Sequence, residues 1–292
     1  MGKVLVTGAG GFIGKSLTAR LQALGRDILP IVSADGDIST RETLSKYDRR
    51  DVACVFHLAG KTFVPDSWDD PLSFYQTNVQ GTINILEFCR KDGIPLTYVS
   101  AYVYGHPDTL PIMEGSAIRP SNPYALTKRL AEEICEFYAD TYDLPVTTIR
   151  PFNVYGVGQR ANFLIPSIIR QALNEPQIVV KDLKPKRDYV YLDDLLRALL
   201  ATLNIKAGGY HVYNVGSGTS LSVKEVIDTI QDVAGTNKEI VCDNTARANE
   251  LMDVVADISK AGKELGWRPK YSFSAGIKDI IQSQGQRNHE HT

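Results

Sequence analysis

Short apolar runs alternate along the first half of the chain with segments whose apolar residues recur at helical spacing. The run KVLVT at residues 3–7 is brief, apolar and bounded by glycine, which is typical of a strand buried in a parallel sheet. From Phe12 to Leu24 apolar residues recur every three or four positions and Gly25 ends the run, so we predict a helix there. The alternation continues with strands predicted over 27–32, 52–60, 95–101 and 145–150, and helices over 78–91 and 124–142.

This alternation indicates an α/β fold built on a doubly wound parallel sheet, because strands that alternate with helices form right-handed βαβ crossovers. In the second half the rhythm is broken by prolines and glycines, which indicates a smaller part interleaved with the last elements of the sheet. We assign the sheet to residues 1–152 together with a returning segment at about 188–216. The smaller part takes residues 153–187 and 217–284, and the polar end 285–292 is expected to be flexible.

Three glycines separate the first predicted strand from the first predicted helix. Gly8, Gly11 and Gly14 stand where the fingerprint of a dinucleotide-binding fold requires glycine. The first would make the tight turn, the second would let a pyrophosphate approach the backbone, and the third would pack the helix against the strand. Val32 and Ser33 stand at the end of the second strand, where an acidic residue usually holds the adenosine ribose, and Asp35 and Asp37 follow only a few residues later. The motif therefore predicts NAD or NADP without deciding between them.

Composition and charge narrow the possible functions. The chain of 292 residues has a formal net charge of −2 and no lysine- or arginine-rich run, which argues against nucleic-acid binding. Its four cysteines lie far apart and form no C-x-x-C pair, so neither a metal site nor a disulfide framework is expected. No apolar run approaches the ~18 residues of a membrane span and no signal-peptide pattern is present, so we expect a soluble cytoplasmic protein.

The segment SNPYALTK at residues 121–128 indicates a proton-transfer site. Tyr124 and Lys128 are four residues apart and share one face of the predicted helix. A tyrosine has an ordinary pKa of about 10, but a neighbouring ammonium favours the phenolate, so Tyr124 is our candidate proton shuttle. Ser100 follows the fourth predicted strand and so belongs to the carboxyl edge of the sheet, where such folds bind their ligands.

Five motifs in a fixed order resemble those of the extended short-chain dehydrogenase/reductases, the group of nucleotide-sugar epimerases and dehydratases. They are the glycine motif, HLAG at 57–60, Ser100 before VYG, YALTK at 124–128 and RPFNVYG at 150–156, and the resemblance extends from residue 3 to about 269. It implies a Rossmann domain that binds NAD(P) and a C-terminal α/β part that binds a nucleoside-diphosphate sugar. It also implies that Tyr124 exchanges a proton with the sugar, Lys128 holds the cofactor ribose and lowers the tyrosine pKa, and Ser100 hydrogen-bonds the reacting oxygen.

The resemblance implies further binding residues. Those expected to contact the cofactor are Gly8, Gly11, Phe12, Ile13, Gly14, Ser33, Asp37, Ile38, Leu58, Ala59, Gly60, Tyr124, Lys128 and Pro151. Those expected to contact the substrate are Lys61, Thr62, Ser100, Tyr102, Asn153, Arg187 and Arg247. In the second set, Asn153 and the two arginines resemble positions that grip the diphosphate, and a guanidinium fork suits paired phosphate oxygens. Asp188 and Asp193 are expected to orient loops or to cap a helix at the edge of the site, and residues 213–226 to form a late strand followed by a capped helix.

The sequence departs from the dehydratases of the family beside Ser100. Ala101 and Tyr102 stand where 4,6-dehydratases carry an Asp-Glu pair, so elimination of water lacks an evident proton donor. The expected reaction is hydride transfer at a ring carbon, most often C4, as epimerisation or as reduction of a 4-keto sugar. Two alternatives are a reductase of a small non-nucleotide carbonyl, which would need no diphosphate clamp, and a non-enzymatic NAD(P)-sensing protein, which typically lacks the tyrosine or the lysine.

The helices predicted at 78–91 and 124–142 bear on the assembly. In the family, the two corresponding helices commonly form a dimer interface. Ile134, Phe137 and Tyr138 are candidates for an apolar patch on it. We therefore expect a homodimer.

Overall fold

A six-stranded sheet forms the first part of the chain, and two smaller sheets form the second. The computed structural model describes residues 2–205, 207–243 and 250–289. They divide into two compact units. The first unit takes the residues up to Gly105, Glu114–Pro151 and Ala198–Asn214, and the second takes His106–Met113, Phe152–Arg197 and the residues from Val215 onward.

The sheet of the first unit has the strand order β2-β1-β3-β4-β5-β9. Neighbours from β2 to β5 pair in parallel, so their carboxyl ends share one edge. The order reverses direction at β1, because β2 lies on one side of it and β3 on the other, and ligands of open α/β sheets bind at such a switch point. The strands are β1 (Lys3–Thr7), β2 (Ile28–Ile31), β3 (Val52–His57), β4 (Leu96–Val99), β5 (Val146–Pro151) and β9 (Tyr210–Val215).

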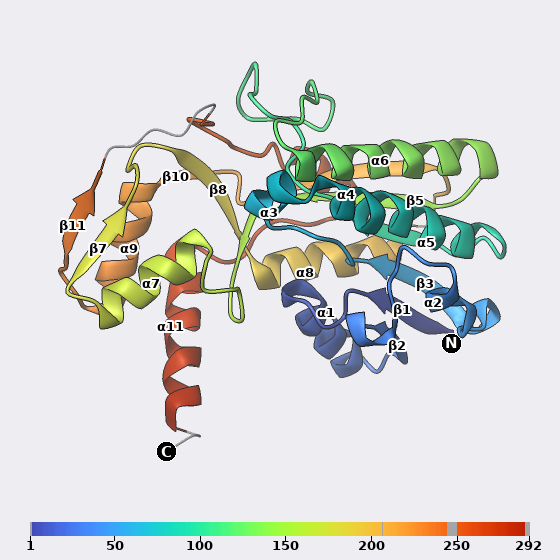
Figure 1. Ribbon diagram of the computed structural model, residues 1–292, viewed down its shortest axis with the longest axis horizontal. Helices are drawn as coiled ribbons and strands as arrows, with labels where there is room; N and C mark the ends of the chain where they lie inside the picture. Colours follow the sequence, from blue (N-terminus) through green and yellow to red (C-terminus); the bar gives the residue numbers. More distant parts are fainter. Residues whose placement is uncertain (1, 206, 244–249, 290–292) are drawn as a thin grey trace. The chain divides into compact units, whose positions relative to one another are not determined.

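Helices cover both faces of this sheet. Figure 1 shows α5 and α6 side by side on one face and α1 on the other. The α-helices are α1 (Phe12–Ala23), α2 (Glu42–Ser45), α3 (Val64–Asp69), α4 (Pro71–Phe74), α5 (Gly81–Arg90) and α6 (Pro123–Tyr142), and α8 (Leu192–Ala201) has residues in both units. Short 3-10 turns are η1 (Ser33–Asp35), η2 (Arg49–Asp51) and η4 (Thr202–Asn204), and η3 (Tyr75–Gln80) is a π-helical segment.

The alternating pattern of the sequence predicted β1 to β5, α1 and α6 to within a few residues, but it did not predict α2, α3, α4 or α8. The predicted parallel α/β sheet is confirmed, and its core is built from the apolar positions of the strands, such as Leu5, Val55 and Leu96, together with Leu86 on α5. β5 ends at the buried Pro151, one of the predicted cofactor contacts. The helix predicted over 78–91 is in fact two pieces, because the π-helical η3 precedes α5.

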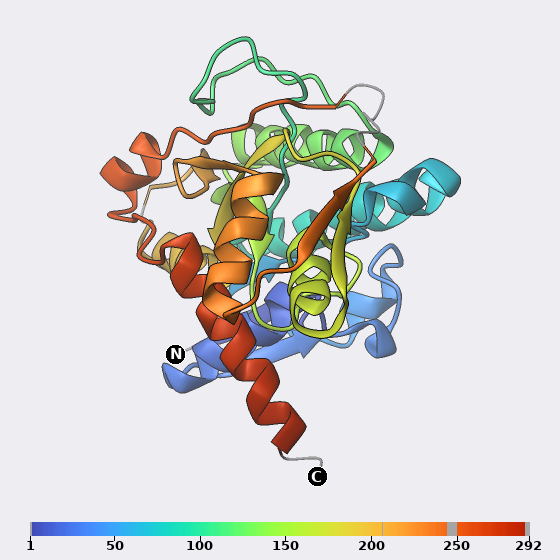
Figure 2. The same cartoon turned by 90° about the vertical axis from the view of Figure 1, so that its left-hand side faces the viewer.

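The second unit has its own core and two small sheets. One sheet has the order β10-β8-β6 and the other pairs β11 with β7. Figure 2 faces this unit and shows α9, in orange, beside the red C-terminal helix α11. Its elements are β6 (Asn153–Tyr155), α7 (Leu164–Asn174), β7 (Gln177–Val180), β8 (Lys186–Tyr191), β10 (Ser220–Ser222), α9 (Val223–Ala234), β11 (Glu239–Cys242), α10 (Ser259–Glu264) and α11 (Phe273–His289).

Several local predictions for the second half can be compared with these elements. The capped helix expected within 213–226 is confirmed, because Ser222 and Glu225 form a capping box at the start of α9. The segment returning to the first unit is Ala198–Asn214 rather than 188–216, since β8 pairs with β6 and β10 in the second unit. α11 continues to His289, into the segment expected to be flexible. Within the described ranges, no helix is long and apolar enough to cross a membrane.

Candidate active site

The glycine turn between β1 and α1 is shaped by close backbone contacts. Gly8 has a φ of +68°, in the left-handed region, and a Cβ there would lie 2.7 Å from the Ala59 nitrogen. A Cβ on Gly14 would lie 2.1 Å from the Gly8 oxygen, so α1 packs directly on the turn. Among the described residues, a Cβ on Gly11 would meet only the Gly8 oxygen, at 3.2 Å. Packing within the protein therefore requires Gly8 and Gly14 and makes a much weaker demand at Gly11.

The segment that follows β3 crosses the glycine turn. The Ala59 amide donates to Thr7 Oγ1 at 3.1 Å, and the Leu58 amide donates to the Thr7 carbonyl oxygen at 3.3 Å. A Cβ on Gly60 would lie 3.7 Å from Lys128 Nζ, the ammonium of the predicted catalytic lysine. The predicted cofactor-binding residues 58–60 are thus brought against both the glycine turn and α6.

An acidic side chain that the sequence places a few residues beyond the second strand is brought back to the end of β2. The turn η1 folds Asp35 back, and its carboxylate accepts a hydrogen bond from the Val32 amide at 2.8 Å. That amide, and then the charge of Lys46, hold the pKa of Asp35 below its ordinary value. The segment that follows β2 therefore carries Ser33 and an ionised carboxylate.

Four other predicted cofactor residues lie near this edge of the sheet. Asp37 is exposed, whereas Ile38 is buried and its carbonyl oxygen accepts a hydrogen bond from Asn84 Nδ2 on α5 at 3.0 Å. Phe12 and Ile13 are the first two residues of α1 and are half-buried. The carbonyl contact fixes the segment after η1 to α5.

Ser100, Tyr124 and Lys128 lie in the first unit, directly after β4 and in the first turns of α6. Asn122 caps α6 with its side chain, which starts the helix just before Tyr124. Lys128 Nζ donates to the Val99 carbonyl oxygen at 2.7 Å, so its ammonium lies beside the residue that precedes Ser100. Ser100 Oγ is buried and has no hydrogen-bond partner in the described part of the chain.

Burial controls the charges of the tyrosine and the lysine. Burial lowers the pKa of Lys128 to about 8, although the Glu132 carboxylate one turn later opposes this shift. The Lys128 ammonium also lies 4.6 Å from the centre of the Tyr98 ring. Burial raises the pKa of Tyr124 above its ordinary value. The sequence led us to expect a lowered tyrosine pKa, and desolvation of the phenolate is the reason for the opposite direction.

Asn78 contacts two segments of the predicted site but was not itself predicted. Its Oδ1 accepts from the Lys61 amide at 2.8 Å, and its Nδ2 donates to the Lys61 carbonyl oxygen and to Thr127 Oγ1, each at 3.0 Å. A Cβ on Gly60 would lie 2.9 Å from Asn78 Oδ1. The residue lies on the π-helical η3, and such segments occur frequently at functional sites. The sequence around it reads as an ordinary helix start, because no residue period marks a π-helical segment.

The predicted substrate residues of the first unit differ in exposure. Lys61 and Thr62 are exposed, and the Lys61 ammonium lies 3.9 Å from the Asp70 carboxylate. Tyr102 is half-buried, and its hydroxyl donates to the Gly105 carbonyl oxygen at 2.6 Å. They follow β3 and β4, at the carboxyl edge that also carries Ser100.

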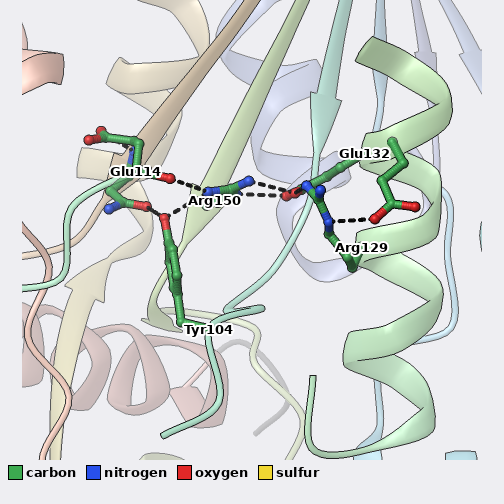
Figure 3. A network of polar contacts seen from close by, with 7 residues as sticks. Tyr104, Glu114, Arg129, Glu132 and Arg150 are labelled. Atoms are coloured by element: carbon green, nitrogen blue, oxygen red, sulfur yellow. Dashed lines mark hydrogen bonds and ion pairs between the residues drawn. The ribbon is translucent and has the colours of Figure 1, made fainter. Parts of the chain in front are cut away.

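A buried charge network joins α6 to the loop that follows Ser100 (Figure 3). Arg150, in β5, donates through Nε and Nη2 to the two carboxylate oxygens of Glu132 at 2.9 and 2.8 Å. Its Nη1 donates to the Tyr104 hydroxyl oxygen at 2.9 Å and to the Glu114 carbonyl oxygen at 3.0 Å. Tyr104 and Glu114 lie on the loop, and Glu132 lies one turn beyond Lys128 on α6. The network therefore fixes the helix and the loop that carry the catalytic candidates.

Arg187, a predicted diphosphate residue, lies in the second unit and is already paired. Its Nη2 donates to the Glu250 carboxylate, and its Nη1 donates to the Leu251 carbonyl oxygen at 2.5 Å and to its neighbour Lys186 at 2.8 Å. The guanidinium thus fixes the segment that begins at Glu250. Arg247, its predicted companion, lies outside the described residues.

Asp188 orients loops of the second unit, as the sequence predicted. Its carboxylate accepts hydrogen bonds from the amides of Ser217, Gly218 and Ala256 at 2.6, 3.0 and 3.1 Å. Burial raises the pKa of Asp188, and these amide donors oppose the rise. Asn153, the third predicted diphosphate residue, donates through Nδ2 to the Asp188 carbonyl oxygen at 3.1 Å.

Comparison with known proteins identifies relatives along the whole chain. Residues 4–216 match the NAD dependent epimerase/dehydratase family. The chain is 32% identical to a putative UDP-glucose 4-epimerase of Methanocaldococcus jannaschii, with 98% of this chain and 99% of that protein covered. It is also 32% identical to the GDP-6-deoxy-D-mannose reductase of Pseudomonas aeruginosa, with 99% of each chain covered.

Solved structures share this fold. MoeE5, solved in complex with UDP-glucose and NAD, has a TM-score of 0.88 and 29% identity, with 98% of this chain and 100% of that chain covered. Structures similar to this chain have been solved with NAD and with NADPH. The chain therefore belongs to the NAD-dependent epimerase/dehydratase family of the extended short-chain dehydrogenase/reductases, and its cofactor is NAD or NADP.

Proposed function

We propose that the protein oxidises and reduces a ring carbon, C4, of a nucleoside-diphosphate sugar, as a 4-epimerase or as a 4-keto-sugar reductase. One observation carries the proposal: the unpartnered, buried Ser100 Oγ stands next to the Val99 carbonyl that holds the Lys128 ammonium. A buried hydroxyl without a partner is costly unless a ligand completes it. The relatives support the substrate class, because one is named a putative UDP-glucose 4-epimerase and another a GDP-6-deoxy-D-mannose reductase.

The residues of the first unit fit NAD(P). Among the three glycines of the turn, Gly11 has the fewest close protein neighbours, which supports its role in the approach of a pyrophosphate. The first turn of α1 offers backbone N–H groups that favour phosphate. Ser33 and Asp35 would hold the adenosine ribose, and Lys128 would hold the nicotinamide ribose. The bound cofactor supplies the acceptor and the donor of the hydride.

Tyr124 is the group that moves the proton. Burial favours the protonated phenol, so Tyr124 Oη can donate its proton to the sugar carbonyl oxygen during reduction, which leaves the phenolate. Oxidation is the reverse step, in which the phenolate form takes the proton of the sugar hydroxyl and becomes the phenol again. The Lys128 ammonium stabilises the phenolate left after the proton has moved. Ser100 Oγ donates a hydrogen bond to the same sugar oxygen and stabilises negative charge on it.

The residues beside Ser100 favour these two reactions over dehydration. Elimination of water from the sugar needs a carboxylic acid that protonates the leaving hydroxyl, and Ala101 and Tyr102 carry no carboxyl group. The Tyr102 hydroxyl is also engaged with the Gly105 carbonyl oxygen. An epimerase leaves the redox state of the cofactor unchanged over a full turnover, whereas a reductase consumes one reduced cofactor for each sugar. Cofactor stoichiometry therefore separates the two.

Arg187, Arg247 and Asn153 are proposed to bind the diphosphate of the substrate. A guanidinium matches paired phosphate oxygens, and each charge-assisted hydrogen bond contributes about 1.5–3 kcal/mol. Because the Glu250 carboxylate already holds Arg187, a diphosphate must compete with it. Removing the charge of Glu250 should therefore strengthen diphosphate binding.

Calorimetry with UDP, GDP and dTDP tests this substrate class. We expect one of them to bind the wild type, and Arg187→Ala and Arg247→Ala to weaken that binding by roughly ten- to a hundredfold each. Glu250→Gln is the matched control and should bind at least as tightly as the wild type. Absence of binding by all three nucleotides would reject a nucleoside-diphosphate sugar as the substrate. If Arg187→Ala and Arg247→Ala bind the nucleotide as tightly as the wild type, only the proposed role of the two arginines is rejected.

A further inference from the structure

A continuous chain of buried hydrogen bonds runs from the end of β1 to the first turn of α6. Its members are at most 1% exposed and are Thr7, His57, Thr82, Asn78 and Thr127. Thr7 Oγ1 lies 2.7 Å from His57 Nδ1, and His57 Nε2 lies 3.1 Å from Thr82 Oγ1. The Thr82 hydroxyl then bonds to the backbone carbonyl oxygen of Asn78, and the side-chain Nδ2 of the same residue donates to Thr127 Oγ1. The Thr127 hydroxyl donates in turn to the Tyr124 carbonyl oxygen at 2.8 Å. Five different elements are joined in this way: β1, β3, η3, α5 and α6.

The partners fix the tautomer of His57. The Thr82 hydroxyl donates to the Asn78 carbonyl oxygen at 2.6 Å, so Thr82 Oγ1 can only accept from the imidazole. We therefore assign the proton to Nε2, which leaves Nδ1 to accept from the Thr7 hydroxyl. Burial, and then the charge of Lys128, lower the pKa of His57 to about 3, so the ring remains neutral at physiological pH. Each link thus has one donor and one acceptor.

Both ends of the chain meet residues of the proposed mechanism. Thr7 precedes Gly8 and accepts from the Ala59 amide, where the glycine turn and the segment after β3 cross. At the other end, Thr127 bonds to the backbone of Tyr124. The chain therefore spans from the segment that binds the cofactor phosphates to the helix turn that carries the proton-transfer residue.

We propose that this chain sets the position of the first turn of α6 relative to the glycine turn, with His57 and Thr82 as positioning residues. The inference rests on the proposed placement of the cofactor between Gly11 and Lys128. A cofactor held at both places binds best when their separation is fixed beforehand, because binding then costs less ordering. Breaking any link frees both ends together.

Cofactor binding measures this coupling without a sugar substrate. Thr7→Val and Thr127→Val keep the side-chain shape and remove one hydroxyl at each end of the chain. We expect each to weaken NAD(H) or NADP(H) binding in calorimetry by about two- to tenfold. The two residues share no contact in the structure, so independent effects would multiply in the double variant. We expect instead that the cofactor dissociation constant of the double variant lies within about twofold of that of the more weakly binding single variant.

Thr202→Val is the matched control. Thr202 is also a buried threonine of the first unit, and its hydroxyl donates to the Leu199 carbonyl oxygen at 2.7 Å and pairs with Thr97. Thr202 lies outside the hydrogen-bonded chain, so Thr202→Val should leave the cofactor dissociation constant unchanged. Added to Thr7→Val, it should leave the dissociation constant of that variant unchanged as well. Thr82→Val should weaken cofactor binding as Thr7→Val and Thr127→Val do. Thr82→Ser keeps the hydroxyl and should bind the cofactor like the wild type.

These outcomes decide the proposal whatever sugar the protein uses. Multiplicative effects of Thr7→Val and Thr127→Val would overturn it, as would an equal effect of Thr202→Val. The proposal would also be overturned if all variants of the hydrogen-bonded chain had lowered thermal stability but unchanged cofactor binding. The chain would then have only a folding role. A failure of every nucleotide sugar to turn over would reject the proposed function, yet would leave this cofactor measurement interpretable.

Discussion

At the scale of single residues, burial sets the pH at which Lys128 loses its charge. Burial brings the pKa of its ammonium down to about 8, and the Glu132 carboxylate limits the fall. The protonated form is the one that donates to the cofactor ribose and stabilises a phenolate at Tyr124. The same burial favours the protonated Tyr124 phenol, so the pair is charged +1 and 0 before it reduces a carbonyl.

Cofactor affinity should therefore depend on pH. The lysine loses its charge as the pH rises through about 8, so we expect the dissociation constant of NAD(P)H to increase through that value. In Lys128→Arg the guanidinium stays charged, so the affinity of the variant should show no such pH dependence, whatever its absolute value. Titration by the fluorescence of bound NAD(P)H gives both curves. A wild-type curve as flat as that of the variant would contradict the assigned role.

Gly14 and Gly11 of the first turn should respond differently to substitution. Gly14→Ala places a Cβ 2.1 Å from a backbone oxygen, so we expect a large loss of thermal stability. Gly11→Val should instead leave the fold nearly intact and abolish cofactor binding, because its side chain would fill the space assigned to the pyrophosphate. Thermal unfolding without cofactor, followed by calorimetry with it, separates the two effects. Unchanged cofactor affinity in Gly11→Val would mean that the turn has no ligand role.

At the scale of elements, the buried pair of Arg150 on β5 and Glu132 on α6 joins the sheet to the catalytic helix. Its bidentate geometry satisfies both carboxylate oxygens, and further bonds to Tyr104 and Glu114 satisfy the guanidinium. A pair of this kind stabilises a particular arrangement more than it stabilises folding, because desolvation offsets most of the attraction. Removing one member of the pair should therefore lower stability mainly because the other charge stays buried without this partner.

Arg150→Met should destabilise the protein by about 3–5 kcal/mol, because it leaves the buried Glu132 carboxylate with only its longer 3.5 Å contact to Arg129. Adding Glu132→Leu should recover much of that loss, since no buried charge then remains. Lys224→Met removes the exposed pair with Asp228 and should cost less than about 1 kcal/mol. Urea unfolding measures all three variants. A double variant whose free energy of unfolding is lower than that of Arg150→Met would contradict this account.

The elements were predictable from sequence where their signal is local. Gly8 and Gly14 recur at fixed spacing after a strand, and the Tyr124–Lys128 spacing follows the helical period, so both were found. The link from His57 to Thr82 spans 25 positions and follows no period, so no pattern in the sequence reveals it. The sequence places Asp35 a few residues beyond the second strand, but it does not reveal the backbone turn that brings the carboxylate back to the end of β2.

At the scale of the whole molecule, each unit has its own apolar core. The first unit carries the predicted cofactor and catalytic residues, and the second carries Asn153 and Arg187. Of the apolar residues predicted for an interface, Ile134 and Tyr138 pack against the core of the first unit, whereas Phe137 is 55% exposed. We propose that Phe137, together with the exposed Leu126 on the same helix, lies at the interface of a homodimer.

Phe137→Glu should then convert a dimer into a monomer, because it places a charge in an apolar interface. Leu24→Glu is the control, since Leu24 is 59% exposed at the end of α1 and belongs to no proposed interface. Light scattering at micromolar concentration gives the mass of each protein. A monomeric wild type would reject the interface, as would a dimer that survives Phe137→Glu.

The central claim is that Tyr124 moves a proton at a ring carbon of a nucleoside-diphosphate sugar. It is tested most directly by NMR of UDP-, GDP- and dTDP-hexoses and their 4-keto forms, incubated with the protein and either NAD(H) or NADP(H). We expect the wild type to form the C4 epimer of one hexose, or to reduce one 4-keto sugar with consumption of one reduced cofactor. Tyr124→Phe should bind the cofactor normally and be slower by roughly 10²–10⁴-fold. No change in any sugar with the wild type, or activity of Tyr124→Phe within about tenfold of it, would contradict the claim.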